Sequence, residues 1–233
     1  MTAAVRSILS DRSLVRDVGA LGLAVFAVSI SFGAIAVAAG IPAGLTILMS
    51  LLVFAGGSQF LAVGLIAAGN PFAAIFAGLL LNARHLPFGL AIGDVIGTRW
   101  WQRLLGAHLL IDESVAFALA QQDPERRRRA YWATGCTLFI LWNIGAVLGV
   151  LLGNAGDPNR LGLDAAFPAG LFALLLPTLK DPTTRLVALT GALVAVVTTP
   201  ILPAGLPVLM ALSGLLLVAV RRRRGPRSSE VPS

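Results

Sequence analysis

The chain has 233 residues, of which 57% are hydrophobic and 12% are charged, and its mean hydropathy is +0.85. A water-soluble domain of this length needs far more polar surface, so the composition excludes an ordinary soluble protein. A net charge of +7 can indicate nucleic-acid binding, but here the Arg residues gather in short clusters between or beyond apolar runs, which is typical of topology signals in membrane proteins.

Charge and hydropathy divide the chain into three parts. Residues 1–17 form an N-terminal segment expected in the cytoplasm, residues 18–220 form a membrane permease domain, and residues 221–233 form a basic, disordered cytoplasmic tail. A cleaved signal peptide is the alternative for the N-terminus. The uncharged run 18–39 exceeds the roughly 7–15 residues of a signal h-region, so a retained helix is favoured.

The apolar runs predict membrane-spanning helices. The uncharged runs 18–39 and 41–69 each exceed the ~20 residues that a helix needs to cross ~30 Å of hydrocarbon. Polar residues interrupt the third stretch, 72–96, so we do not expect one simple helix there. Further apolar stretches follow at 104–120, 131–153, 165–179, 186–201 and 204–220. The prediction is an all-α polytopic integral membrane protein with about seven or eight hydrophobic segments, some of them broken or re-entrant.

Basic clusters indicate the orientation. They precede the first span, lie at residues 126–129, and close the chain from residue 221. An even number of crossings between consecutive clusters would place all three, and both termini, in the cytoplasm. The similar patterns IPAGL (41–45) and LPAGL (202–206) are typical of an internal repeat, although Pro-Ala-Gly turns between helices also arise by chance.

A glycine pair lies inside the second span, in the motif FAGGSQF (54–60). Gly56 and Gly57 permit backbone distortion, while Ser58 and Gln59 add polar groups at membrane depth. Either the helix breaks here and exposes backbone donors and acceptors, or the glycines allow close helix packing. These residues leave both possibilities open.

The motif LNARHLP (81–87) interrupts the third stretch. Arg84 in hydrocarbon would cost ~2.5–3.5 kcal/mol on insertion scales and must face protein, water or the interface. Asn82 and His85 would share one helical face with Gly89. The alternative is a loop that only interrupts the apolar run, since Pro87 favours a break.

The motif HLLIDES (108–114) places His108 and Asp112 on one helical face, with Glu113 about 100° away. Adjacent acids in an apolar helix are costly unless they are protonated or paired. They are therefore candidates for handling a proton or an ammonium group, with Arg84 as a conceivable partner. The alternative is an interfacial segment with solvated acids.

Two further positions each have two interpretations. Asp164 opens an apolar stretch and is either a helix N-cap or a functional acid. Trp142, next to Asn143 within the fifth span, serves packing or contacts a substrate.

Enzyme signatures are missing from the sequence. There is no G-x-x-x-x-G-K loop, no Cys/His metal spacing and no H-E-x-x-H. Ser58 with His85 or His108 supplies the residue types of an intramembrane protease without a recognised signature around them. We expect no enzymatic activity, cofactor or metal.

Four motifs occur in the order VFAGGSQFLAVGLIAAG, LLLNARHLPFGL, HLLIDESVAFAL and LGLDAAFPA. Together they resemble the AzlC family, the large subunits of two-component branched-chain amino acid exporters. The resemblance implies a permease of the bacterial inner membrane that works with a small hydrophobic AzlD-type subunit and exports leucine, isoleucine, valine and sometimes methionine. The chain departs from the family pattern at Pro87 and Phe88, where Leu and Tyr are usual, and at Ala165, where Phe is common.

An exported amino acid is a zwitterion with an apolar side chain, so its site needs donors for a carboxylate, an acceptor for an ammonium group and an apolar pocket. We expect backbone N–H groups near Gly56 and Gly57, with Ser58 and Gln59, to hold the carboxylate. Asp112 or Glu113 would balance the ammonium group or carry a coupling proton. Trp142 and Phe60 would line the side-chain pocket. The alternative function is a passive channel or an auxiliary membrane subunit for another small solute.

Overall fold

The computed structural model describes residues 12–155, 172, 176, 178–202 and 206–215. The chain divides into two compact units, Met1–Gly170 and Leu171–Ser233. Helices dominate both units and no strand occurs within the described ranges, which confirms the predicted all-α fold. In the described part of the chain, three helical stretches are long and apolar enough to cross a membrane: Arg12–Ala38, Pro71–Ala91 and Pro124–Ala155.

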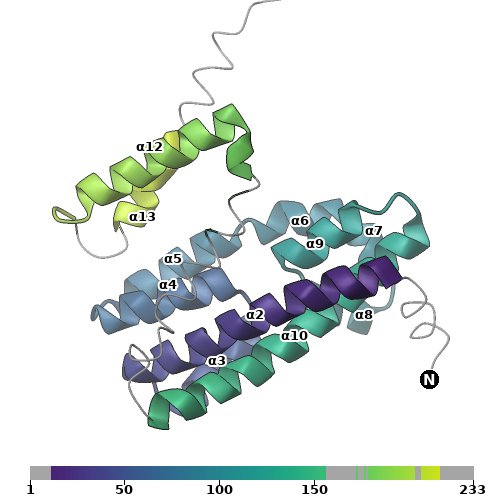
Figure 1. Ribbon diagram of the computed structural model, residues 1–233, viewed down its shortest axis with the longest axis horizontal. Helices are drawn as coiled ribbons and strands as arrows, with labels where there is room; N and C mark the ends of the chain where they lie inside the picture. Colours follow the sequence, from purple (N-terminus) through teal and green to yellow (C-terminus); the bar gives the residue numbers. More distant parts are fainter. Residues whose placement is uncertain (1–11, 156–171, 173–175, 177, 203–205, 216–233) are drawn as a thin grey trace, which may run out of the picture. The chain divides into compact units, whose positions relative to one another are not determined.

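The first unit contains nine described helices (Figure 1): α2 (Arg12–Ala38), α3 (Ala43–Val53), α4 (Gly56–Ala67), α5 (Pro71–Asn82), α6 (His85–Ala91), α7 (Gly93–Ile96), α8 (Trp100–His108), α9 (Asp112–Leu119) and α10 (Pro124–Ala155). The second unit contains η2 (Thr178–Lys180), α12 (Pro182–Thr198), α13 (Leu206–Ala211) and η3 (Leu212–Leu215). Helix α12 begins at a capping residue, because Asp181 accepts a hydrogen bond from the Thr184 N–H at 2.6 Å.

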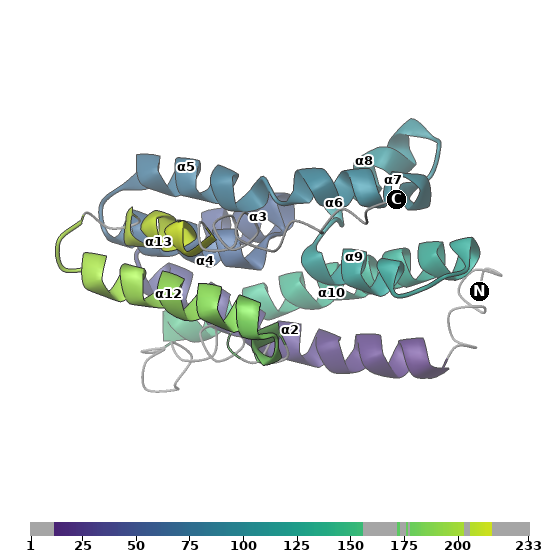
Figure 2. The same cartoon turned by 90° about the horizontal axis from the view of Figure 1, so that it is seen from above.

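Helices α2 and α10 lie side by side and run in the same direction (Figures 1 and 2). Glycines allow this approach, because a Cβ on Gly145 would meet Ser29 and one on Gly149 would meet the Ile30 carbonyl. Small residues four apart thus let two long spans pack backbone to backbone. Since the helices are parallel, their basic starts lie at the same end of the unit, as an even number of intervening crossings requires.

The second predicted span is two helices. Helix α3 ends at Val53 and α4 begins at Gly56, and between them Phe54 has φ 24° and ψ 57°. The third stretch is also interrupted, as predicted, and forms α5, α6 and α7. The break between α5 and α6 falls at Ala83 and Arg84. Pro87 has no N–H and cannot donate to the Ala83 carbonyl four residues earlier, which favours a break at this point.

One prediction about the fourth stretch is wrong. His108 and Asp112 do not share a helical face, because α8 ends at His108 and α9 begins at Asp112. The Ser114 hydroxyl oxygen accepts a hydrogen bond from the Ile111 N–H at 3.1 Å and lies 2.9 Å from the Leu109 carbonyl oxygen. This side chain replaces the backbone bonds that a continuous helix would make, and acids in the first turn suit a helix start.

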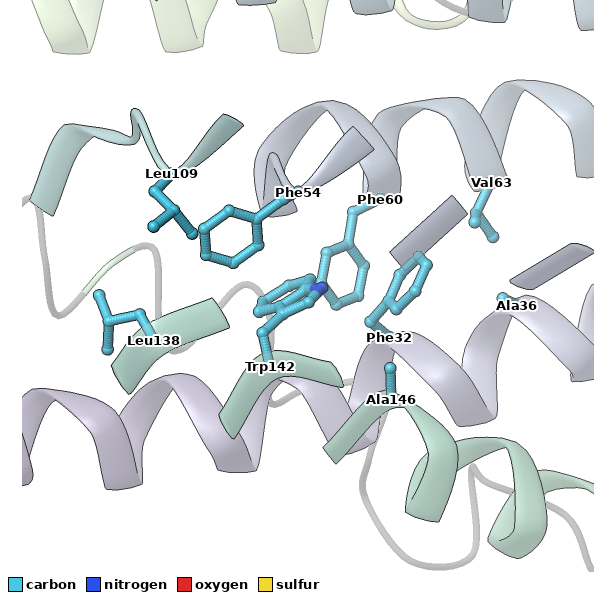
Figure 3. Packing of buried hydrophobic residues seen from close by; sticks show 9 residues of the cluster. All are labelled: Phe32, Ala36, Phe54, Phe60, Val63, Leu109, Leu138, Trp142 and Ala146. Atoms are coloured by element: carbon cyan, nitrogen blue, oxygen red, sulfur yellow. The ribbon is translucent and has the colours of Figure 1, made fainter. Parts of the chain in front are cut away.

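The main core lies where α2, α4 and α10 meet around aromatic rings (Figure 3). Phe32 stacks on Trp142 with ring centroids 5.7 Å apart and contacts Phe60 edge to face at 5.6 Å. A second cluster joins α7, α9 and α10 around Ile92, Val115 and Tyr131. Each aromatic ring buries a large apolar area, so these contacts fix the three helices against one another.

Several predictions fall outside the described residues. They concern Asp164, the middle (203–205) of the second repeat copy 202–206, and the basic tail 221–233. Most of the predicted stretch 165–179 is outside as well, whereas the predicted stretch 186–201 corresponds to α12. The number of crossings and the cytoplasmic location of both termini stay predictions.

Candidate functional site at two helix breaks

Two interrupted helices meet at their breaks. The His108 Nε2 atom, at the end of α8, lies 2.8 Å from the Leu51 carbonyl oxygen in the last turn of α3. Leu51 lies shortly before the α3–α4 break, and the Phe54 ring at that break is 6.4 Å from the His108 ring. Phe54 and Leu109, one from each break, belong to the same buried cluster (Figure 3). The two non-helical segments therefore lie together inside the bundle.

The start of α4 offers backbone donors. The first N–H groups of a helix have no partner within that helix, and here they belong to Gly56, Gly57 and Ser58. The side chains of Ser58 and Gln59 brace the break, since the Ser58 hydroxyl donates to the Ala55 carbonyl at 2.9 Å and Gln59 Nε2 donates to the Met49 carbonyl at 3.0 Å. These hydrogen bonds stabilise the break, and the N–H groups in the first turn of α4 are suited to bind an anionic group.

An ion pair stands beside this helix start. Arg84 Nη1 lies 3.3 Å from Asp112 Oδ2, and the two side chains are 38% and 44% exposed. A Cβ placed on Gly57 would lie 3.9 Å from Arg84 Nη2, so the guanidinium group reaches the first turn of α4. The Arg84 Nε atom and the Asp112 Oδ1 atom are buried and have no hydrogen-bond partner among the described residues. The pair thus keeps an unused donor and an unused acceptor.

Other predicted residues surround the pair. His85 and Glu113 both interact electrostatically with Arg84 and Asp112. Asn82 ends α5, and its Oδ1 atom is buried without a hydrogen-bond partner in the described part of the chain. Of the predicted charged residues, Arg84, His85, Asp112 and Glu113 therefore gather at one place, and the pairing of Arg84 with Asp112 is present. His108 lies apart from them, between Leu51 and the aromatic rings of Phe54 and Phe139.

The predicted apolar pocket residues are packed in the core. Trp142 is 5% exposed, and a Cβ on Gly56 would come within 2.8 Å of its Cη2 atom. Phe60 meets Trp142 through Phe32, which contacts both rings. Both interpretations of the glycine motif therefore apply. The helix breaks there, and Gly56 also allows the Trp142 ring to pack closely. Contact between Trp142 or Phe60 and a substrate stays a prediction.

Sequence reasoning missed three parts of the site. The Ser50 hydroxyl donates to Asn143 Oδ1 at 2.8 Å and links α3 to α10. A serine inside an apolar run could have indicated such a contact between helices. The Asp-Glu-Ser start of α9 was a second available signal, since acids mark a first helical turn. Nothing in the sequence indicates the left-handed conformation of Phe54.

No group of three or more His, Cys, Asp or Glu side chains within the described ranges could hold a metal ion. The charged cluster contains the Arg84–Asp112 ion pair together with a donor and an acceptor that have no hydrogen-bond partner among the described residues. Its chemistry suits a ligand that carries charge, held between helix ends.

Comparison with known proteins identifies the family. Residues 20–155 match the family model described as "AzlC protein". The chain is 27% identical over 195 residues to a branched-chain amino acid transport protein, AzlC, of Bacillus subtilis (strain 168), with 81% of this chain and 77% of the relative covered. It is 32% identical over 178 residues to an uncharacterized membrane protein of Archaeoglobus fulgidus, with 74% and 77% covered. No solved structure matches the chain. The chain belongs to the AzlC family, a family of membrane transport proteins and not of enzymes.

Proposed function

We propose that this chain exports branched-chain and other hydrophobic amino acids across the bacterial inner membrane, together with a small hydrophobic subunit of the AzlD type and driven by protons. The similarity to a relative named for branched-chain amino acid transport supports the substrate class. One structural observation carries the proposal. The Arg84–Asp112 ion pair lies beside the open start of α4 and keeps an unused donor and an unused acceptor.

An amino acid zwitterion complements this arrangement. Its carboxylate accepts from Arg84 and from the N–H groups at the start of α4, and its ammonium group donates to Asp112. The two protein charges compensate each other while the site is empty, and the two substrate charges compensate them when it is occupied. This matters because a single unpaired charge in the membrane costs ~2.5–3.5 kcal/mol on insertion scales.

The same reasoning predicts selectivity for the complete zwitterion. The keto acid of leucine lacks the ammonium group and would leave Asp112 unpaired, whereas the corresponding amine lacks the carboxylate and would leave Arg84 unpaired. Both should compete with leucine far less well than valine or isoleucine do. Apolar side chains at the site, such as Leu81, whose Cδ2 atom would be 3.7 Å from a Cβ on Gly57, suit an aliphatic substrate.

Proton coupling supplies the driving force in this proposal. A zwitterion has no net charge, so the membrane potential alone does little for its movement, whereas one coupled proton brings ~2.3 kcal/mol per 100 mV. Glu113 and His85 lie close enough to Asp112 to interact with it electrostatically. Protonation of one member of this group would change the charge balance around Arg84 and so the affinity for substrate.

The test is efflux of preloaded leucine, valine and methionine from cells that express the chain with and without the small subunit, each with and without a protonophore. The proposal requires efflux against a concentration gradient that needs the subunit and stops with the protonophore. Downhill flux unaffected by either change would instead indicate a passive channel. No flux of any of these amino acids would indicate another solute or an auxiliary role.

A further inference from the structure

An open pocket of about 730 Å³ lies at the end of the first unit where α2 and α10 begin and α9 ends. Arg12 contributes from α2, and Arg126 and Arg129 contribute from α10. Leu14 and Phe117 add apolar surface between them. At a share of ~30 Å³ per water molecule, this volume is far larger than a single small ion requires.

Three positive charges line the pocket, from Arg12, Arg126 and Arg129. None of them forms an ion pair with another described residue, whereas Arg127 of the same cluster lies 3.6 Å from Asp94 and donates to the Ala91 carbonyl at 2.7 Å. Among the described lining residues the one acid is Asp17, which is paired with Arg16 at 3.0 Å. Three guanidinium groups gathered around one hollow repel one another, and an anionic ligand would offset that repulsion.

We propose that this pocket binds the headgroup of an anionic phospholipid. Arginine forks bind phosphate oxygens in a bidentate manner, and the apolar side chains beside them suit the glycerol and the first part of an acyl chain. The position agrees with this ligand, because α2 and α10 are spans whose starts lie at the same end, where lipid headgroups meet the protein. The inference involves none of the residues assigned to transport and does not depend on the proposed substrate.

Native mass spectrometry of the purified full-length chain provides the test, with phosphatidylglycerol, phosphatidylcholine and inorganic phosphate as probes. Arg126→Gln and Arg129→Gln remove a pocket side chain, while Arg128→Gln removes an equal charge from an exposed neighbour that does not line the pocket. We expect retained phosphatidylglycerol on the wild type and on Arg128→Gln, a loss of affinity of about tenfold in each pocket variant, and no retention of phosphatidylcholine.

Three results would overturn the proposal. An equal loss in Arg128→Gln would assign the effect to diffuse surface charge. Displacement of the lipid by millimolar inorganic phosphate would assign the site to free phosphate. Equal retention of both lipids would show that the pocket does not recognise the anionic headgroup. Each variant is first checked for a single symmetric peak in size-exclusion chromatography, so that a folding defect is not counted as lost binding.

Discussion

Arg84 and Asp112 pair with each other from two separate helix interruptions, Arg84 at the α5–α6 junction and Asp112 at the first residue of α9. Neither charge stands inside a continuous helix. The backbone around each one can therefore adjust without breaking a regular hydrogen-bond ladder. In the proposed transport cycle, this ion pair would open to admit the substrate while the long helices stay in place.

Asp112→Asn should abolish energised efflux and also lower the amount of protein in the membrane. The substitution leaves Arg84 without its counter-charge, at a cost of up to ~2.5–3.5 kcal/mol that is smaller here because both side chains are more than a third exposed. The measurement is leucine efflux normalised to the membrane level of a tagged protein.

The double variant Arg84→Gln with Asp112→Asn separates stability from function. It removes both charges, so the membrane level should return toward that of the wild type while efflux stays absent. Efflux restored together with the membrane level would show that the pair is only structural.

Gly57→Ala should impair transport without harming the fold. The added methyl group would lie 3.7 Å from Leu81 Cδ2 and 3.9 Å from Arg84 Nη2, which are ordinary contact distances. It would still narrow the approach to the start of α4, so the KM for leucine should rise several-fold at unchanged protein level. Gly64→Ala on the same helix is the control, because its methyl group would meet nothing within 4 Å. Equal KM values in the two variants would exclude this helix start as the carboxylate site.

The sequence predicted a helix break where glycine residues mark it, and missed the break that no glycine or proline marks. Gly56 and Gly57 marked the interruption of the second span, and the cost of a charge in hydrocarbon led to Arg84 and its partner. The break at residues 109–111 was missed because Leu-Leu-Ile contains no glycine or proline. It arises from Ser114, whose hydroxyl binds backbone groups that lie before it.

Long-range packing was not predictable from local pattern. The stacking of Phe32 on Trp142 joins two helices that are distant in sequence, and apolar periodicity does not specify which aromatic residues meet. The parallel pairing of α2 with α10 has a partial signal in glycines four apart, but such spacing does not name its partner helix.

His108→Phe should weaken the contact between the α3–α4 break and the α8–α9 break. Phenylalanine keeps ring contacts with Phe54 and Phe139 but cannot donate to the Leu51 carbonyl, and the loss of one such hydrogen bond costs about 0.5–1.5 kcal/mol. We expect a lower melting temperature and reduced efflux. His108→Gln restores a donor, so it should recover part of both. A wild-type melting temperature in His108→Phe would mean that this hydrogen bond does not hold the breaks together.

Asp181 should make the start of α12 sensitive to acid. The Thr184 N–H donates to this carboxylate and lowers its pKa from the usual value of 3.8. A lowered pKa means that the carboxylate stabilises the folded helix start above pH 3.8 and that this contribution is lost as the pH falls through the lower folded value. Hydrogen exchange over residues 182–190 should therefore accelerate in acid relative to Asp181→Asn, which keeps an acceptor but does not titrate. The same acid response in both proteins would contradict the cap.

Gly149→Ala should separate α2 from α10. Its methyl group would collide with the Ile30 carbonyl oxygen and come within 3.0 Å of the Ala34 nitrogen, and backbone atoms cannot rotate away as a flexible side chain can. Overpacking of this kind costs about 1–3 kcal/mol, which should appear as a lower melting temperature in detergent. Gly78→Ala on α5 is the matched control, since its methyl group would meet nothing within 4 Å and alanine favours a helix. If both variants melt like the wild type, glycine is not required where the two parallel spans touch, and the backbone-to-backbone packing of α2 on α10 would be wrong.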